Sequence, residues 1–121
     1  MPRSSATQHE LQRVGLLAGL PGQTLAQLGK AMTREEIAPG TVVVREGGDD
    51  DRFYVVFAGM LTVANTIGPR GVLRPGDYFG EVAPVMGVPR TATVTAMTPC
   101  VVASCDRAAF DEFVRPLFAD D

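Results

Sequence analysis

Two side chains of opposite charge stand in one loop of the sequence, in a pattern suited to holding a sugar phosphate. Glu81 follows a glycine, Gly80, and Arg90 enters at the far end of the same loop. A planar guanidinium can donate two hydrogen bonds to phosphate oxygens at once. A carboxylate repels phosphate, but it accepts hydrogen bonds from sugar hydroxyls, as in dinucleotide sites. The loop therefore predicts a site where sugar and phosphate chemistry meet.

The residues between these side chains predict a short helix that would contribute backbone donors. The stretch from Gly80 to Gly87 has room for about two turns, and we expect the helix to begin near Val82. The first amides of a helix have no partner within it, and a preceding glycine lets an anion approach them closely. Pro84 falls in the first turn, where proline removes no hydrogen bond that would otherwise form.

Helical periodicity marks the chain before this loop. Apolar residues spaced for one helix face predict a short amphipathic helix from about Gln8 to Leu17. A second helix should follow the interruption at 20–22, with an apolar side formed by Leu25, Leu28 and Met32. We therefore expect residues 1–33 to form an N-terminal helical segment.

From residue 34 to 105 the sequence becomes a series of short β-branched and aromatic runs. Thirteen glycines and nine prolines in the chain supply frequent turn signals between them. We expect strands over 41–45, 53–57, 60–66, 94–97 and 100–104, and turns that include 68–71. Short strands with this punctuation predict a mainly β fold with flanking helices, an antiparallel β-roll of jelly-roll type. The candidate loop, residues 78–94, lies within this roll.

The last part of the chain, residues 106–121, predicts one C-terminal helix. Asp106 is placed to accept hydrogen bonds from the free amides at a helix start. The spacing of Phe110, Phe113, Val114 and Leu117 is that of a buried helical face, and Pro116 disturbs the helix near its end. No linker divides the sequence, so we expect residues 1–121 to form a single domain.

Composition excludes several classes of partner. The formal net charge is -3 and Lys30 is the only lysine, whereas binding a nucleic-acid backbone requires clustered positive charge. No apolar run approaches the ~20 residues of a membrane-spanning helix. Two nearby cysteines, Cys100 and Cys105, favour buried thiols in a reducing compartment. We expect a cytoplasmic domain with neither nucleic-acid contact nor membrane insertion, as a whole protein or as the soluble part of a larger, even membrane-bound, one.

Residues for catalysis or metal binding are scarce. His9 is the only histidine, so the clustered ligands of a metal-dependent β-roll enzyme are missing. Neither cysteine stands beside a candidate base. The acidic run 49–51 is expected to be a solvated hairpin loop, not a cation site. We predict a protein that is not an enzyme and holds no metal.

Several motifs, taken together, resemble the cyclic nucleotide-binding domains of cyclic-nucleotide-dependent kinases, gated channels and catabolite-activator-type regulators. The segments Phe79-Gly80-Glu81-Val82-Ala83 and Pro89-Arg90-Thr91-Ala92-Thr93-Val94 resemble the phosphate-binding cassette of that family. Further resemblance lies at 16–21, 39–40, 45–47, 53–59 and 75–78. It covers most of the chain from Leu16 to Phe113.

The resemblance implies a site for cAMP or cGMP built from seven residues, Gly80, Glu81, Val82, Ala83, Arg90, Thr91 and Ala92. In this family pattern Glu81 binds the ribose 2′-hydroxyl and Arg90 pairs with the cyclic phosphate. The backbone amides near 82, 83 and 92 complete the cradle, and Gly80 permits the close approach. A hydroxyl at Thr91 is compatible with cGMP without excluding cAMP.

The implied function is a sensor domain that controls an attached or partner effector. Family members usually continue into a longer helix that caps the base, whereas this sequence reaches Asp121 soon after Pro116. The lid is therefore missing, very short or supplied by another segment. A ligand-independent interaction module with the same fold, and the sensor half of a transcription regulator, stay open as alternatives. A plain ion pair between Glu81 and Arg90 also stays open, as do the ligand's base, the effector and a homodimer.

Overall fold

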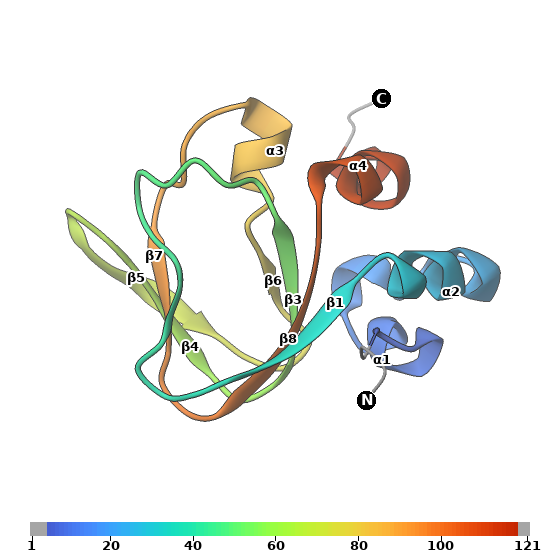
Figure 1. Ribbon diagram of the computed structural model, residues 1–121, viewed down its shortest axis with the longest axis horizontal. Helices are drawn as coiled ribbons and strands as arrows, with labels where there is room; N and C mark the ends of the chain where they lie inside the picture. Colours follow the sequence, from blue (N-terminus) through green and yellow to red (C-terminus); the bar gives the residue numbers. More distant parts are fainter. Residues whose placement is uncertain (1–4, 119–121) are drawn as a thin grey trace.

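Two four-stranded antiparallel sheets form the centre of the computed structural model, which describes residues 5–118. One sheet has the order β1-β8-β3-β6 and the other β2-β7-β4-β5 (Figure 1). The strands are β1 Thr33–Ile37, β2 Val42–Val44, β3 Phe53–Ala58, β4 Leu61–Asn65, β5 Gly68–Leu73, β6 Tyr78–Phe79, β7 Thr93–Ala96 and β8 Cys100–Cys105. This architecture confirms the predicted fold class.

The helices gather mainly on one side of the β1-β8-β3-β6 sheet, as Figure 1 shows. They are α1 Gln8–Gln12, η1 Gly15–Leu17, α2 Gly22–Lys30, α3 Val82–Met86, α4 Arg107–Ala109, η2 Phe110–Val114 and η3 Arg115–Phe118. Within residues 5–118, every helix is too short or too polar to cross a membrane.

The single helix predicted from Gln8 to Leu17 is wrong, because the chain breaks between two short turns. Thr7 caps α1 in a capping box with Glu10. Val14 then adopts extended backbone angles, φ −88° and ψ 115°, before the 3₁₀ turn of η1 begins. The apolar spacing was nonetheless informative, because Val14 and Leu17 are fully buried.

Edge positions explain the strands that the sequence did not reveal. The charged segment of β1 pairs only with β8, and its two glutamates, Glu35 and Glu36, are exposed. Residues 68–71, expected to turn the chain, instead belong to β5, which pairs only with β4. An edge strand tolerates glycine and proline because one row of its backbone groups needs no partner strand. The turn is formed by residues 66–67, where the Asn65 side chain accepts hydrogen bonds from the amides of Ile67 and Gly68.

Strand β3 separates two apolar clusters, which explains why its first four residues are all buried. Phe53 and Val55 pack toward the helices, whereas Tyr54 and Val56 pack toward the second sheet. Successive side chains of a strand point to opposite faces, so a strand covered on both faces is apolar throughout.

The C-terminal helix begins as predicted, but its apolar face shifts along the chain. The Asp106 carboxylate accepts a hydrogen bond of 3.0 Å from the amide of Ala109. Residues 110–114 form a π turn, which holds more residues than an α turn. The prediction for Leu117 is therefore wrong, because its side chain is 37% exposed. Phe118 takes the inward position, 6.1 Å from Phe110 between ring centroids.

Candidate functional site

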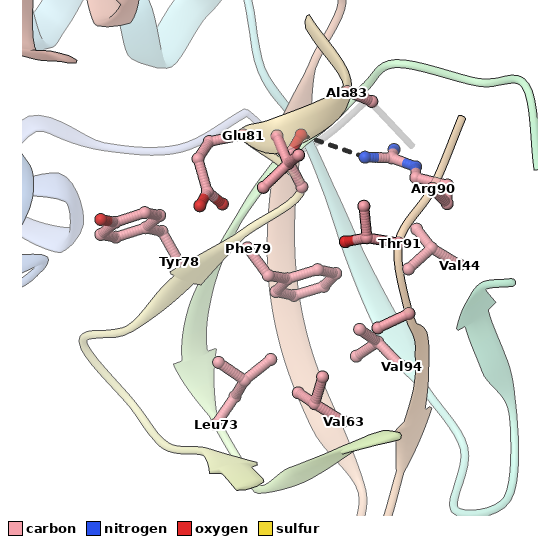
Figure 2. A pocket seen from close by; sticks show the side chains of 13 residues that line it. Val44, Val63, Leu73, Tyr78, Phe79, Glu81, Ala83, Arg90, Thr91 and Val94 are labelled. Atoms are coloured by element: carbon pink, nitrogen blue, oxygen red, sulfur yellow. Dashed lines mark hydrogen bonds between the residues drawn. The ribbon is translucent and has the colours of Figure 1, made fainter. Parts of the chain in front are cut away.

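The predicted loop lines a pocket of about 340 Å³ at the β6–α3 junction and the start of β7. Figure 2 shows its apolar floor below the loop, formed by side chains from both sheets. The lining residues are Val44, Val63, Leu73, Tyr78, Phe79, Gly80, Glu81, Val82, Ala83, Arg90, Thr91, Ala92 and Val94. All seven residues predicted from the sequence are among them, so the fold brings them together around one space.

Helix α3 begins at Val82, where the sequence predicted a helix start, and Gly80 precedes it with a φ of +90°. The amides of Glu81, Val82 and Ala83 have no acceptor within the helix, and the next residue, Pro84, has no N–H to satisfy. The Glu81 side chain accepts no capping bond from these amides. The pocket therefore meets a helix start whose donors are not used by the helix itself.

Gly80 is required by the protein itself. A Cβ at this position would lie 2.7 Å from the carbonyl oxygen of Arg52 and 3.0 Å from Nη1 of Arg90. Its positive φ also disfavours any side chain. The family resemblance implies that this glycine admits a ligand, whereas in the structure the close approach is between protein groups.

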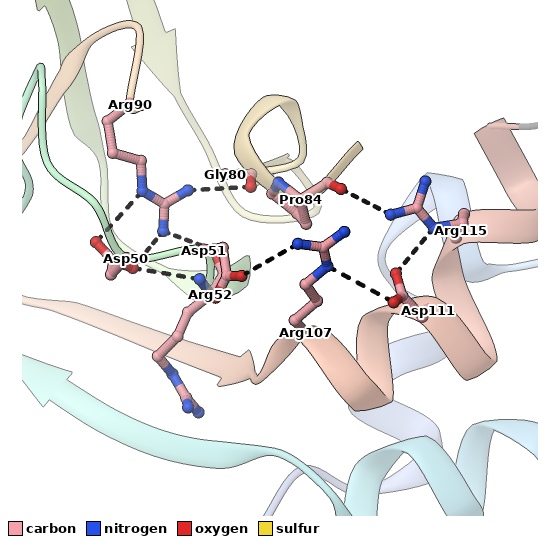
Figure 3. A network of polar contacts seen from close by, with 9 residues as sticks. All are labelled: Asp50, Asp51, Arg52, Gly80, Pro84, Arg90, Arg107, Asp111 and Arg115. Carbon is pink, nitrogen blue, oxygen red and sulfur yellow. Dashed lines mark hydrogen bonds and ion pairs between the residues drawn. The ribbon is translucent and has the colours of Figure 1, made fainter. Parts of the chain in front are cut away.

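The guanidinium of Arg90 is buried, with the residue 5% exposed, and it bonds to three protein groups. Nη2 donates to the Asp50 carboxylate at 2.5 Å and to the carbonyl oxygen of Arg52 at 2.7 Å. Nε lies 3.4 Å from the second Asp50 oxygen, and Nη1 donates to the Gly80 carbonyl oxygen at 3.0 Å. Figure 3 shows this arrangement. The carboxylate partner of Arg90 is therefore Asp50, and the alternative of an ion pair with Glu81 does not hold.

These bonds limit how Arg90 can meet a ligand. A guanidinium has five N–H groups, and the four bonds above leave one, on Nη1. A phosphate oxygen can be bound by that group without breaking any of them. A two-oxygen grip, which the sequence suggested, requires Arg90 to release a protein acceptor first.

The acidic run 49–51 was expected to be a solvated hairpin loop. The run is largely exposed, but it joins strands of different sheets, and the half-exposed side chain of Asp50 also binds Arg90. Partial burial alone would raise the pKa of its carboxyl group. The hydrogen bond from Arg90, the amide of Arg52 and both arginine charges outweigh burial, so the pKa lies below its ordinary value of 3.8. Asp50 is thus a carboxylate at neutral pH. The sequence offered only the acidic run as a signal, because the burial of Arg90, which requires a carboxylate partner, is visible only in the structure.

The loop after β2 also fixes the backbone of Arg90. The Gly47 amide donates to the Arg90 carbonyl oxygen at 2.8 Å, and the Arg90 amide donates to the Gly48 carbonyl oxygen at 2.9 Å. The Glu46 amide donates to the Thr93 hydroxyl at 2.9 Å. Residues 46–52 therefore belong to the site as its supporting loop.

Glu81 and Thr91 lie at the pocket without the ties that hold Arg90. The Glu81 carboxylate lies on the Tyr78 side of the pocket (Figure 2). Burial, with the Glu81 charge as a second cause, raises the pKa of Tyr78, which keeps its phenol neutral. Thr91 is exposed at the pocket, and beneath it the ring of Phe79 stacks on Tyr54 with centroids 4.7 Å apart. The chemistry available is a carboxylate acceptor, a hydroxyl and a rigid apolar floor.

No metal centre emerges among residues 5–118, where no three histidine, cysteine or acidic side chains gather around one point. Both cysteines are buried free thiols. Burial raises the pKa of the Cys105 thiol to about 12, which leaves it protonated and unreactive.

The β-roll thus arranges a fixed arginine, a helix start and a carboxylate around one apolar-floored pocket. The family model for the cyclic nucleotide-binding domain matches residues 34–116. The chain belongs to the cyclic nucleotide-binding domain family, which confirms the resemblance found in the sequence.

Its relatives include regulatory subunits of cAMP-dependent protein kinase. The chain is 39% identical over 110 residues to the subunit from Yarrowia lipolytica, covering 88% of this chain and 29% of that protein. It is 32% identical over 117 residues to the subunit from Dictyostelium discoideum, covering 88% of this chain and 35% of that protein. The chain thus spans about a third or less of the length of these curated relatives.

Solved structures agree with this assignment. The regulatory domain of Toxoplasma gondii PKA with cAMP matches with a TM-score of 0.86 and 28% identity, covering 91% of this chain and 44% of that one. The regulatory subunit of a cAMP-independent protein kinase A from Trypanosoma cruzi, bound to guanosine, matches with a TM-score of 0.82 and 26% identity, covering 90% and 40%.

Proposed function

We propose that this domain binds a cyclic nucleotide, cAMP or cGMP, and that occupancy of the pocket controls an attached or partner effector. One observation carries the proposal: the buried, fixed side chain of Arg90 and the free amides at the start of α3 line the same pocket. Both favour an anionic group, and the fixed geometry avoids much of the ordering cost of binding. The pocket volume of about 340 Å³ also suits a small molecule.

Each proposed contact follows from a group at the pocket. The phosphate takes the remaining N–H of Arg90 and the amides near 82, 83 and 92. Glu81 accepts from a ribose hydroxyl, because its carboxylate is not used to cap α3. The base lies toward the apolar floor, and Thr91 is placed to influence base choice. Gly80 serves the phosphate only indirectly, by giving Arg90 and Arg52 their close approach.

The rest of the assignment completes this proposal. Residues 1–121 act as one domain, in the cytoplasm, with no catalytic activity of its own. The relatives named above are regulatory subunits of a kinase, which favours a protein kinase chain as the effector. An interaction module that needs no ligand is not favoured, because side chains of residues 5–118 leave the pocket open.

Calorimetric titration of the full-length protein tests the proposal. We expect saturable binding of cAMP, cGMP or both, and loss of most affinity in Arg90→Ala, because a charge-assisted contact disappears. Arg70→Ala, an exposed arginine on edge strand β5, is the matched control and should bind normally. Guanosine belongs in the same series, because a structural neighbour binds it. Absence of saturable binding below millimolar cyclic nucleotide would refute the proposal. Tighter binding of guanosine than of either cyclic nucleotide would identify the ligand as a nucleoside instead.

A further inference from the structure

The carbonyl group of Pro84 receives its hydrogen bond from a distant part of the chain. Helix α3 has five residues, and its last carbonyl groups have no later amide of the helix to bind. The Gly87 amide bonds to the Ala83 carbonyl oxygen. Nη2 of Arg115 donates to the Pro84 carbonyl oxygen at 2.7 Å. The arginine charge also lies near the negative end of the α3 dipole, which favours the contact.

Arg115 is itself held in direction by its own segment. The Asp111 carboxylate accepts a hydrogen bond of 2.8 Å from Nε of Arg115. The guanidinium carbon lies 5.8 Å from the centroid of the Phe110 ring. Figure 3 shows the resulting line of contacts from Asp111 through Arg115 to Pro84. Because two groups orient the guanidinium, its bond to α3 loses less side-chain entropy than a free arginine would.

Residues 107–118, here named the C-terminal segment, approach the site at two further points. Arg107 lies 3.9 Å from Asp51, the neighbour of the carboxylate that holds Arg90, and both side chains are largely exposed. Such an exposed pair contributes little by itself. The Phe118 ring packs edge-on against Tyr78, with centroids 5.8 Å apart, and Tyr78 lines the pocket. The segment therefore contacts β6 through Phe118 and α3 through Arg115.

We infer that Arg115 is a positioning residue for the ligand site. It does not line the pocket, but it binds the residue after Ala83, whose amide does face the proposed phosphate. Loss of this bond would leave α3 to be ordered at the moment of binding, which lowers affinity. The coupling is reciprocal. If the bond between Arg115 and Pro84 raises ligand affinity by some factor, a bound ligand raises the equilibrium constant for forming that bond by the same factor. The affinity part of this inference rests on the proposed function.

The test compares Arg115→Gln with Arg115→Lys, and uses exposed Glu112→Gln in the same segment as the control. In the ligand-free protein, amide hydrogen exchange at Val85 and Gly87 should be faster in Arg115→Gln and unchanged in the control. The dissociation constant for the bound cyclic nucleotide should rise about fivefold or more in Arg115→Gln. Arg115→Lys should recover part of both effects, because it restores a charged donor.

The two readouts separate this inference from the proposed function. Unchanged exchange at Val85 and Gly87 in folded Arg115→Gln overturns the positioning role, whatever the protein binds. Unchanged or tighter nucleotide affinity in that variant overturns the coupling to the pocket. If the wild type binds no nucleotide but exchange is faster in Arg115→Gln, the proposed function is wrong. The role of Arg115 in ordering α3 is then still supported. Asp111→Asn, which releases Arg115 without removing it, replaces Arg115→Gln if that variant does not fold, and it should show the same two effects in weaker form.

Discussion

The Arg90 guanidinium and the Asp50 carboxylate form an ion pair that joins the predicted phosphate loop to the loop after β2. Their closest atoms, Nη2 and Oδ1, are 2.5 Å apart. The pair is asymmetric, because the Arg90 side chain is 3% exposed and the Asp50 side chain 50% exposed. A buried charge depends on its partner more than an exposed one does. Breaking the pair therefore destabilises the protein mainly by leaving the buried charge of Arg90 without its carboxylate partner.

Asp50→Asn should destabilise the protein and weaken cyclic nucleotide binding together. We expect a loss of about 1–2 kcal/mol in the free energy of unfolding, less than for a fully buried pair because Asp50 is half exposed. Urea unfolding measures the first effect and calorimetry the second. The neighbouring exposed residue gives the control, Asp49→Asn, which should change neither. Equal effects of the two substitutions would contradict a specific role for Asp50.

The same pair predicts a difference between wild type and Asp50→Asn that depends on pH. Burial raises the pKa of Asp50, but the interactions with Arg90 and Arg52 together lower it by more. The pKa in the folded protein therefore lies below 3.8. A lowered folded pKa gives stability that is fully present above the unfolded value and is lost as pH falls through the folded value. The gap in unfolding free energy should thus be widest near neutral pH and narrow below pH 3.8. A gap that is constant down to acid pH would show that the charge of Asp50 is irrelevant. Comparing the two proteins cancels the similar contribution of Glu10, whose pKa is also lowered.

Gly80→Ala should cost more stability than Gly87→Ala. Both glycines have positive φ angles, +90° and +69°, so each alanine adds backbone strain of about 1–2 kcal/mol. Only at Gly80 would the new Cβ also meet protein atoms, 2.7 Å from the Arg52 carbonyl oxygen, while none lies within 4 Å at Gly87. Thermal or urea unfolding of both variants gives the comparison. Equal losses would mean that the crowding at Gly80 is relieved by movement of Arg52.

Glu81→Gln should reveal the sugar contact when it is tested with two ligands. Replacing the carboxylate by a neutral amide weakens its bond with a ribose hydroxyl, and we expect affinity for cAMP to fall about tenfold. Affinity for 2′-deoxy-cAMP should change much less, because that ligand lacks the hydroxyl. Competition calorimetry with wild type and variant gives, for each ligand, the ratio of the two dissociation constants. An equal fall for both ligands would place the role of Glu81 elsewhere than at the 2′-hydroxyl.

The elements that the sequence predicted well are those whose signal is local and whose faces are buried. Strand β3 and strand β8 are rich in apolar residues because apolar clusters cover both of their faces. Strands β1 and β5 escaped prediction because edge strands tolerate charge, glycine and proline. The inward turn of Phe118 in place of Leu117 also escaped, since a π turn leaves no clear mark in the apolar spacing.

The sequence by itself determined which residues form the pocket loop. Gly80, the helix start at Val82 and Pro84 in its first turn follow from backbone preferences of single residues, which act over a few positions. Only the tertiary structure decided what those residues contact. Asp50 lies 40 positions from Arg90, and Pro84 lies 31 positions from Arg115. A charged side chain takes the partner that packing brings within reach, and spacing along the chain does not reveal that choice.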